Sequence, residues 1–165
     1  MRRSILGVLC AFFFMGGMEA AQSEENASLS YAVPDLVLQI AKGFGDVKLG
    51  QDKRGWPLIV GRSEGFNYYI FFYGCEEDLE KCKAIAFRGF WKKPEVANLL
   101  EILNAYNAKL RFGKAYLYEN GDLVLDLEVE MQYGMSRENL EENFRNWIGA
   151  VRGFKRDVAA KLSDS

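Results

Sequence analysis

The 165-residue sequence contains no histidine, so it lacks the usual proton shuttle of hydrolases and a common metal ligand. Glycine-rich phosphate loops are absent as well, because Gly61, Gly65 and Gly74 are spaced like turns. The net charge of −2 has no strong sign, and the basic residues form no stripe that would bind phosphates. We therefore expect no enzyme, no cofactor, no metal site and no nucleic-acid partner.

Long hydrophobic runs are scarce, and the first of them lies at the N-terminus, from Ile5 to Met15. Arg2 and Arg3 precede this run and small or polar residues follow it, which is the order of a signal peptide. The alternative is an uncleaved anchor, but the run is shorter than the about 20 apolar residues that span a bilayer. We predict that residues 1–21 are a cleaved signal, and that the mature protein is periplasmic or secreted without a membrane span.

Cysteine is also rare: removal of Cys10 with the signal leaves only Cys75 and Cys82. An even count in an exported domain indicates a disulfide, which would close a hairpin-like connection here. A redox pair is less suitable because the acidic residues between the two cysteines disfavour a thiolate. A metal site is weaker still, because two sulfurs without histidine leave the coordination shell half empty.

The remaining sequence predicts a polar, disordered leader over residues 22–32 and one α+β domain over residues 33–162. Apolar periodicity and turn residues indicate the order helix, antiparallel strands, helix, β-hairpin and long C-terminal helix. The first expected elements are a helix from Pro34 and strands 47–49, 58–62, 66–73 and 84–91. A second helix is opened by Pro94 and Glu95 and carries Val96, Leu99, Leu100 and Leu103 on one face. A hairpin over 109–131 and a helix from Ser136 to Leu162 follow. Asn104 and Asn107 are expected to cap the middle helix.

The hairpin register follows from Asn120-Gly121, the preferred pair for a two-residue type I′ turn. This turn predicts that Tyr116 faces Leu125 in the core, and that Ala115 faces Asp126 on a wet, acidic side. Asp126 and Glu128 on that side could serve as acid and base at a glycosidic bond. Exposure to solvent explains their alternation equally well, and we favour that interpretation.

The most apolar strand, residues 66–73, carries aromatic or aliphatic side chains in both alternating sets. Such a strand is covered on both faces, by helices on one side and by a loop, a terminal segment or a second subunit on the other. The alternative is that part of the second face binds a partner. Which set is open cannot be deduced from the sequence; the candidate binding surface comprises Trp56, Tyr69, Phe71, Tyr73 and Trp91.

An ordered series of short motifs resembles the YbjN family over Pro34 to Phe154: Gly55-Trp56-Pro57, Tyr73-Gly74-Cys75, Cys82, Phe90-Trp91, Asn104 through Asn107, Arg111 through Leu117 and Asn120-Gly121-Asp122. This family is described as bacterial sensory transduction regulators, with a fold similar to class I type III secretion chaperones. The resemblance implies a non-enzymatic role in binding a protein or peptide, with no catalytic residues.

We therefore expect an exported protein-binding or regulatory module that binds its partner through a sheet edge or an aromatic groove. The partner can also be a second copy, which would give a homodimer. A small-ligand-binding or envelope-stress protein is the alternative. A carboxylate-based hydrolase comes third.

Overall fold

The computed structural model describes residues 29–63, 65–92 and 96–160. The predicted signal peptide and most of the predicted leader lie outside the described residues, as do Pro94, Glu95 and Leu162. The last part of the leader is described, and it contacts the domain. The backbones of Leu29 and Met135 form one antiparallel bridge, and those of Ala32 and Cys82 form another.

The described chain forms one antiparallel sheet of six strands with the order β1-β2-β3-β4-β6-β5, so the α+β prediction is confirmed. The bounds predicted for the third and fourth strands agree with the structure. In chain order the elements are α2 (Pro34–Ala41), the 3₁₀ turn η1 (Lys42–Phe44), β1 (Asp46–Gln51), β2 (Pro57–Ser63), β3 (Phe66–Tyr73), β4 (Ala84–Trp91), α3 (Leu99–Asn107), β5 (Lys114–Leu117), β6 (Leu123–Glu130), α4 (Arg137–Phe154) and the π-helical turn η2 (Lys155–Ala159).

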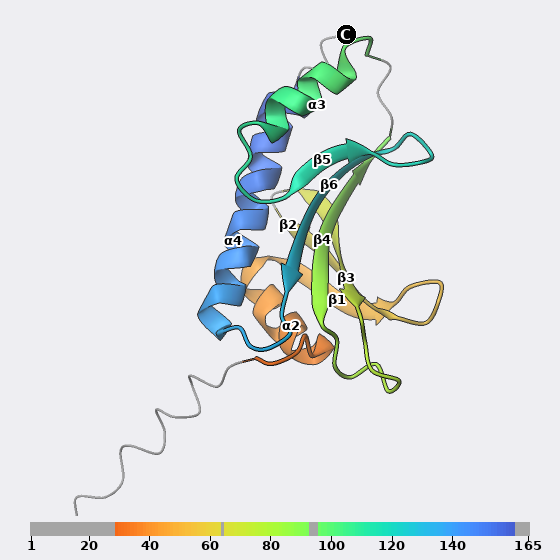
Figure 1. The fold of residues 1–165 in the computed structure, drawn as a ribbon, viewed down its shortest axis with the longest axis vertical. Coiled ribbons are helices and arrows are strands. Elements are labelled where there is room, and N and C mark those ends of the chain that lie inside the picture. Colours follow the sequence, from red (N-terminus) through yellow and green to blue (C-terminus); the bar gives the residue numbers. More distant parts are fainter. Residues whose placement is uncertain (1–28, 64, 93–95, 161–165) are drawn as a thin grey trace, which may run out of the picture.

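The helices lie on one side of the sheet, with α4 running along it, as Figure 1 shows. Ser136 caps α4 as predicted, because its hydroxyl accepts a hydrogen bond from the Asn139 N–H at 3.2 Å. The buried stripe of α4 meets β4 through aromatic rings: the Phe87 ring lies 4.7 Å from that of Phe144 and 5.8 Å from that of Trp147. The helix-facing side of the sheet therefore forms the core.

The predicted hairpin register is wrong by one residue, because Ala115 pairs with Leu125 and Tyr116 with Val124. Tyr118 pairs with Asp122 through its N–H, and the loop comprises residues 119–121. A type I′ turn needs a positive φ at both central residues, but only Gly121 has one, at 85°. The side chain of Asn120 instead accepts a hydrogen bond from the Asp122 N–H at 2.9 Å.

The shifted register turns the side chains of β5 to the other face of the sheet, whereas those of β6 lie on the faces predicted for them. Ala115 is buried on the helix side, and Asp126 is 1% exposed rather than wet. Glu128 is exposed, as predicted. The hairpin strand is also shorter than expected, since β5 begins at Lys114 and Phe112 is exposed.

Two expectations for α3 are wrong. Leu100 is 69% exposed, because the buried face of α3 is formed by Leu99, Leu103 and Tyr106 and does not include it. Asn107 does not stop the helix in a left-handed conformation. Its amide Nδ2 donates to the Ala115 carbonyl at 2.9 Å, and its Oδ1 accepts from the Ala115 N–H at 2.8 Å, so it binds the outer edge of β5.

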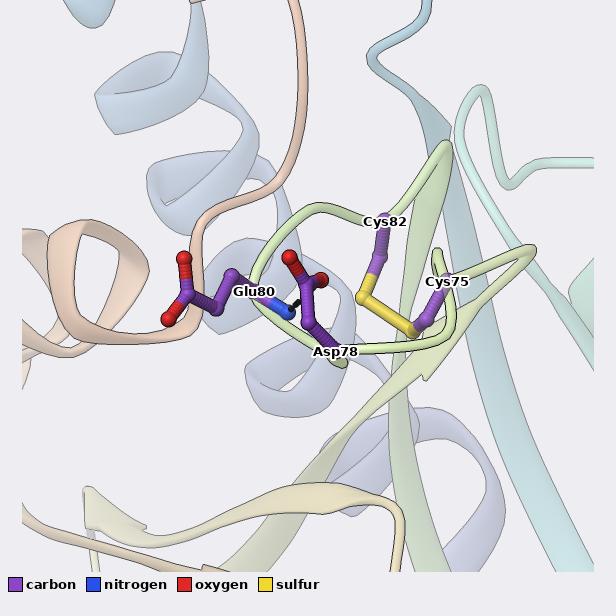
Figure 2. Close-up of a disulfide and its surroundings, with 4 residues drawn as sticks. All are labelled: Cys75, Asp78, Glu80 and Cys82. Atoms are coloured by element: carbon purple, nitrogen blue, oxygen red, sulfur yellow. Dashed lines mark hydrogen bonds between the residues drawn. A yellow bond between two sulfur atoms is a disulfide. The ribbon is translucent and has the colours of Figure 1, made fainter.

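Cys75 and Cys82 form the predicted disulfide, with their Cα atoms 3.8 Å apart (Figure 2). Cys82 is fully buried, and its backbone N–H and carbonyl both bond Ala32. Inside the loop, an Asp78 carboxylate oxygen accepts from the Glu80 N–H at 3.0 Å (Figure 2). The disulfide loop is thus fixed at the end of the sheet beside the segment that leads into α2.

The hydroxyl of Tyr68 is buried without a hydrogen-bond partner among the described residues, and burial raises its pKa to about 12. We expect Tyr68→Phe to raise the free energy of unfolding by about 1 kcal/mol at pH 7, because an unpaired buried polar group is removed. Above about pH 10 the tyrosine ionises only in the unfolded chain, so the wild type loses stability and the gap widens.

Urea unfolding of both proteins at pH 7 and pH 11 measures this gap. Tyr133→Phe is the control, since Tyr133 is 92% exposed. A Tyr68→Phe protein less stable than the wild type at both pH values would contradict the prediction.

Candidate functional site

The sheet face opposite the helices is an aromatic surface without a covering helix in the described chain (Figure 1). Antiparallel register places directly paired residues on the same face. Tyr69 pairs with Val60 and Arg88, and Arg88 pairs with Asp126. These residues, together with the alternate neighbours along their strands, form what we call the open face: Leu58, Val60, Tyr69, Phe71, Tyr73, Arg88, Phe90, Tyr116 and Asp126.

Aromatic rings at the centre of the open face contact one another across β3 and β4. The ring of Phe90 lies 5.7 Å from that of Tyr69 and 6.4 Å from that of Phe71, both edge to face. Phe90 and Val60 are each 41% exposed, whereas Tyr69, Phe71 and Tyr73 are half-buried. The rings thus form a connected apolar patch that is accessible from one side.

An ion pair lies within this patch. The Arg88 Nε atom is 3.3 Å from Asp126 Oδ1, and the Arg88 guanidinium lies over the rings of Phe71 at 5.4 Å and Tyr73 at 5.6 Å. Asp126 is almost fully buried, whereas the Arg88 side chain is 20% exposed. Lys114 approaches the same carboxylate at 3.8 Å. The Arg88–Asp126 pair thus lies at the centre of the open face, beside the aromatic rings of Phe71 and Tyr73.

Tyr116 completes this network from β5, because its hydroxyl donates to Asp126 Oδ2 at 3.4 Å. Burial, reinforced by the Asp126 charge, raises the pKa of Tyr116. Burial likewise raises the pKa of Tyr73, although the Arg88 charge opposes the change. Both hydroxyls therefore remain protonated at neutral pH, and that of Tyr116 donates to Asp126.

The open face is hollowed between the β1–β2 turn and the β5–β6 hairpin. The hollow has a volume of about 500 Å³, and its lining includes Arg54, Tyr73, Arg88, Phe90 and Tyr118. A second hollow of about 410 Å³ lies on the other side of Phe90 and reaches Leu58 and Tyr69. Shallow aromatic depressions of this kind fit protein side chains better than an enclosed small molecule.

The predicted surface residues separate into three places. Tyr69, Phe71 and Tyr73 lie together on the open face. Trp56 lies in the β1–β2 turn, where the Arg54 guanidinium covers its ring at 5.0 Å. Trp91 is on the opposite face, with its ring 4.5 Å from that of Phe154, so it belongs to the helix side of the sheet.

Sequence reasoning did not assign Phe90, Tyr116 or Arg88 to the candidate surface. The alternation along β4 already places Phe90 and Arg88 on one face. Only the register between β3 and β4 shows that this is the face of Tyr69 and Phe71. The sequence analysis placed Tyr116 in the core because its predicted hairpin register differs from the observed one by one residue. Identification of the Asn120 side-chain turn would have corrected its position.

Comparison with family models finds the YbjN model, described as "Putative bacterial sensory transduction regulator", over residues 34–160. The chain belongs to the YbjN family. The match covers most of the chain and includes every strand of the sheet. A search of curated proteins finds no match.

The YbjN family is described as a regulator, and that description names no enzymatic activity. Among the described residues, no group of three or more histidine, cysteine, aspartate or glutamate side chains could hold a metal ion. The helices in the described ranges include none that is both long and apolar enough to cross a bilayer. The disulfide fits an oxidising compartment.

Proposed function

We propose that this YbjN protein is an exported regulatory module that binds a protein partner through its open face. The observation that carries the proposal is the connected patch of Tyr69, Phe71 and Phe90 on a face without a described helix. Accessible aromatic clusters of this kind commonly serve as anchors in protein interfaces.

The chemistry of the face supports a protein partner over a substrate. Its central carboxylate, Asp126, is already paired with Arg88 and is not accessible as an acid or base. The phenol hydroxyls and the Arg88 guanidinium can donate hydrogen bonds beside the apolar rings, a combination typical of interface centres. The family description as a regulator agrees with this role.

Export belongs to the same proposal. The N-terminal sequence has the pattern of a signal peptide, and the disulfide would persist outside the cytoplasm. Intact-mass analysis and fractionation of the native protein test export directly. Full-length protein retained with the membrane or in the cytoplasm would contradict it.

Tyr69→Ala is the variant that tests the binding surface. We expect it to weaken partner capture by about 1 kcal/mol or more, roughly a fivefold loss of affinity, because an interface anchor is removed. Its stability should change little, since Tyr69 packs on the solvent side of the sheet. Quantitative capture from envelope extracts, followed by titration of the captured protein, measures the change.

The matched control is Tyr133→Ala, which removes an exposed tyrosine outside the open face. Thermal melts of both variants separate folding from binding. Equal partner affinity of the wild type and Tyr69→Ala, at equal stability, would exclude the open face as the binding surface.

A further inference from the structure

The two edges of the sheet differ in accessibility. At one edge, the Asn107 side chain occupies the outward N–H and carbonyl of Ala115 in β5. At the other edge, β1 pairs with β2 alone, and no other described backbone group bonds its outer side. An edge strand directs alternate N–H and C=O groups outward, so β1 can accept a further strand.

An apolar groove of about 510 Å³ lies beside the end of β1. One wall is the start of α2, with Val33 and Pro34, and the other is Leu79 at the tip of the disulfide loop. Leu49 of β1 and Pro57 of β2 also line the groove. An extended chain paired with β1 would place every second side chain towards this groove, because side chains alternate along a strand.

The rim of the groove is acidic. Asp35 and Glu80 line it, and neither carboxylate forms an ion pair with a described residue. Figure 2 shows Glu80 projecting from the disulfide loop, on the side of the loop that faces the pale orange segment. The loop between the cysteines carries four carboxylates against one lysine. A basic side chain at this rim would therefore be attracted, and an acidic one repelled.

We infer that the β1 edge and this groove form a second binding site, separate from the open face, for an extended peptide segment with apolar residues in alternation followed by lysine or arginine. The backbone of β1 supplies the hydrogen bonds, and the groove receives an apolar side chain. Asp35 and Glu80 select the basic residue. The disulfide holds the wall that carries Leu79 and Glu80.

The probe is a fluorescein-labelled peptide of about eight residues, the length of an ordinary strand, that alternates threonine with valine and ends in two lysines. We expect fluorescence anisotropy to show saturable binding to the oxidised protein. A peptide with two glutamates in place of the lysines should bind at least about tenfold more weakly. Two further peptides are N-methylated at alternate residues, one at the odd and one at the even positions. The peptide whose methyl groups replace the N–H groups that point towards β1 should lose binding, because it cannot pair with the edge.

Leu79→Gly separates binding from folding. Leu79 has a φ of 61°, a conformation that glycine adopts at little cost, so the variant should fold at least as stably as the wild type. It nevertheless removes the apolar wall, and we expect affinity for the lysine peptide to fall about tenfold. Glu80→Gln should reduce the preference for the lysine peptide over the glutamate peptide while preserving the backbone pairing.

Tyr69→Ala separates a test of this second site from a test of the proposed function. The variant alters the open face, and it should leave the affinity of the β1 edge for the lysine peptide unchanged. Three results would each overturn the inference. These are no binding of the lysine peptide, equal binding by the wild type and Leu79→Gly, and equal binding of the lysine and glutamate peptides.

Discussion

Replacement of Arg88 by methionine is expected to lower the free energy of unfolding by about 3 kcal/mol or more, because it leaves the Asp126 carboxylate buried without its closest cation. Methionine keeps an apolar side chain at this position but lacks the guanidinium that lies over Phe71 and Tyr73, so the loss includes both the ion pair and these cation–π contacts. Urea unfolding followed by circular dichroism measures the change.

A double variant tests the cause. Adding Asp126→Leu to Arg88→Met removes both charges, and we expect it to recover most of the lost stability. The control is Arg145→Met on α4, whose ion pairs with Glu141 and Glu142 are exposed; its effect should stay within about 1 kcal/mol. If the double variant is no more stable than Arg88→Met alone, the stability comes from something other than charge pairing.

Phe87→Ala should destabilise the protein by about 3–5 kcal/mol, since Phe87 is fully buried between the rings of Phe144 and Trp147. Phe90→Ala is an internal control of the same residue type on the same strand. Phe90 lies on the open face and is 41% exposed, so its truncation should cost far less stability. Thermal and urea unfolding of the two variants give the comparison.

A similar loss of stability in both variants would show that the two faces of β4 are equally packed. That result would also weaken the proposal that the open face is available to a partner. A small loss in Phe90→Ala, together with reduced partner capture, is the outcome that the proposed function expects.

The strands were predicted well where local sequence decides the outcome. The runs of β3 and β4 are apolar apart from Asn67 and Arg88 and have polar or turn residues at both ends, so their bounds could be deduced from composition. The N-cap of α4 was equally local, because Ser136 requires only the N–H of Asn139.

The errors arose where a side chain competed with the backbone. Asn120 bonds the Asp122 N–H and selects a longer loop than its pairing with glycine suggested, which shifts the hairpin by one residue. Asn107 acts across space on β5 and not at the end of its own helix. The Asn120 turn is local but competes with the type I′ turn that Asn-Gly also favours, whereas the Asn107 contact depends on where β5 lies.

The candidate site was only partly predictable for the same reason. Alternation grouped Tyr69, Phe71 and Tyr73 correctly, but the choice of exposed face depends on where the helices pack. Trp91 shows the limit of residue type, because a tryptophan suited to an interface lies instead against Phe154. The likeness to secretion chaperones stays a prediction.

The side chain of Asn107 has a consequence for polymerisation. A sheet with two accessible edges can join further copies in both directions, which is how strand-mediated filaments grow. In this protein the β5 edge is occupied at Ala115. A further strand that approaches β5 therefore finds the outward N–H and carbonyl of Ala115 already bonded, which disfavours extension of the sheet from that edge. Asn107 thus leaves β1 as the edge of the sheet at which addition of a strand meets less competition from the protein's own side chains.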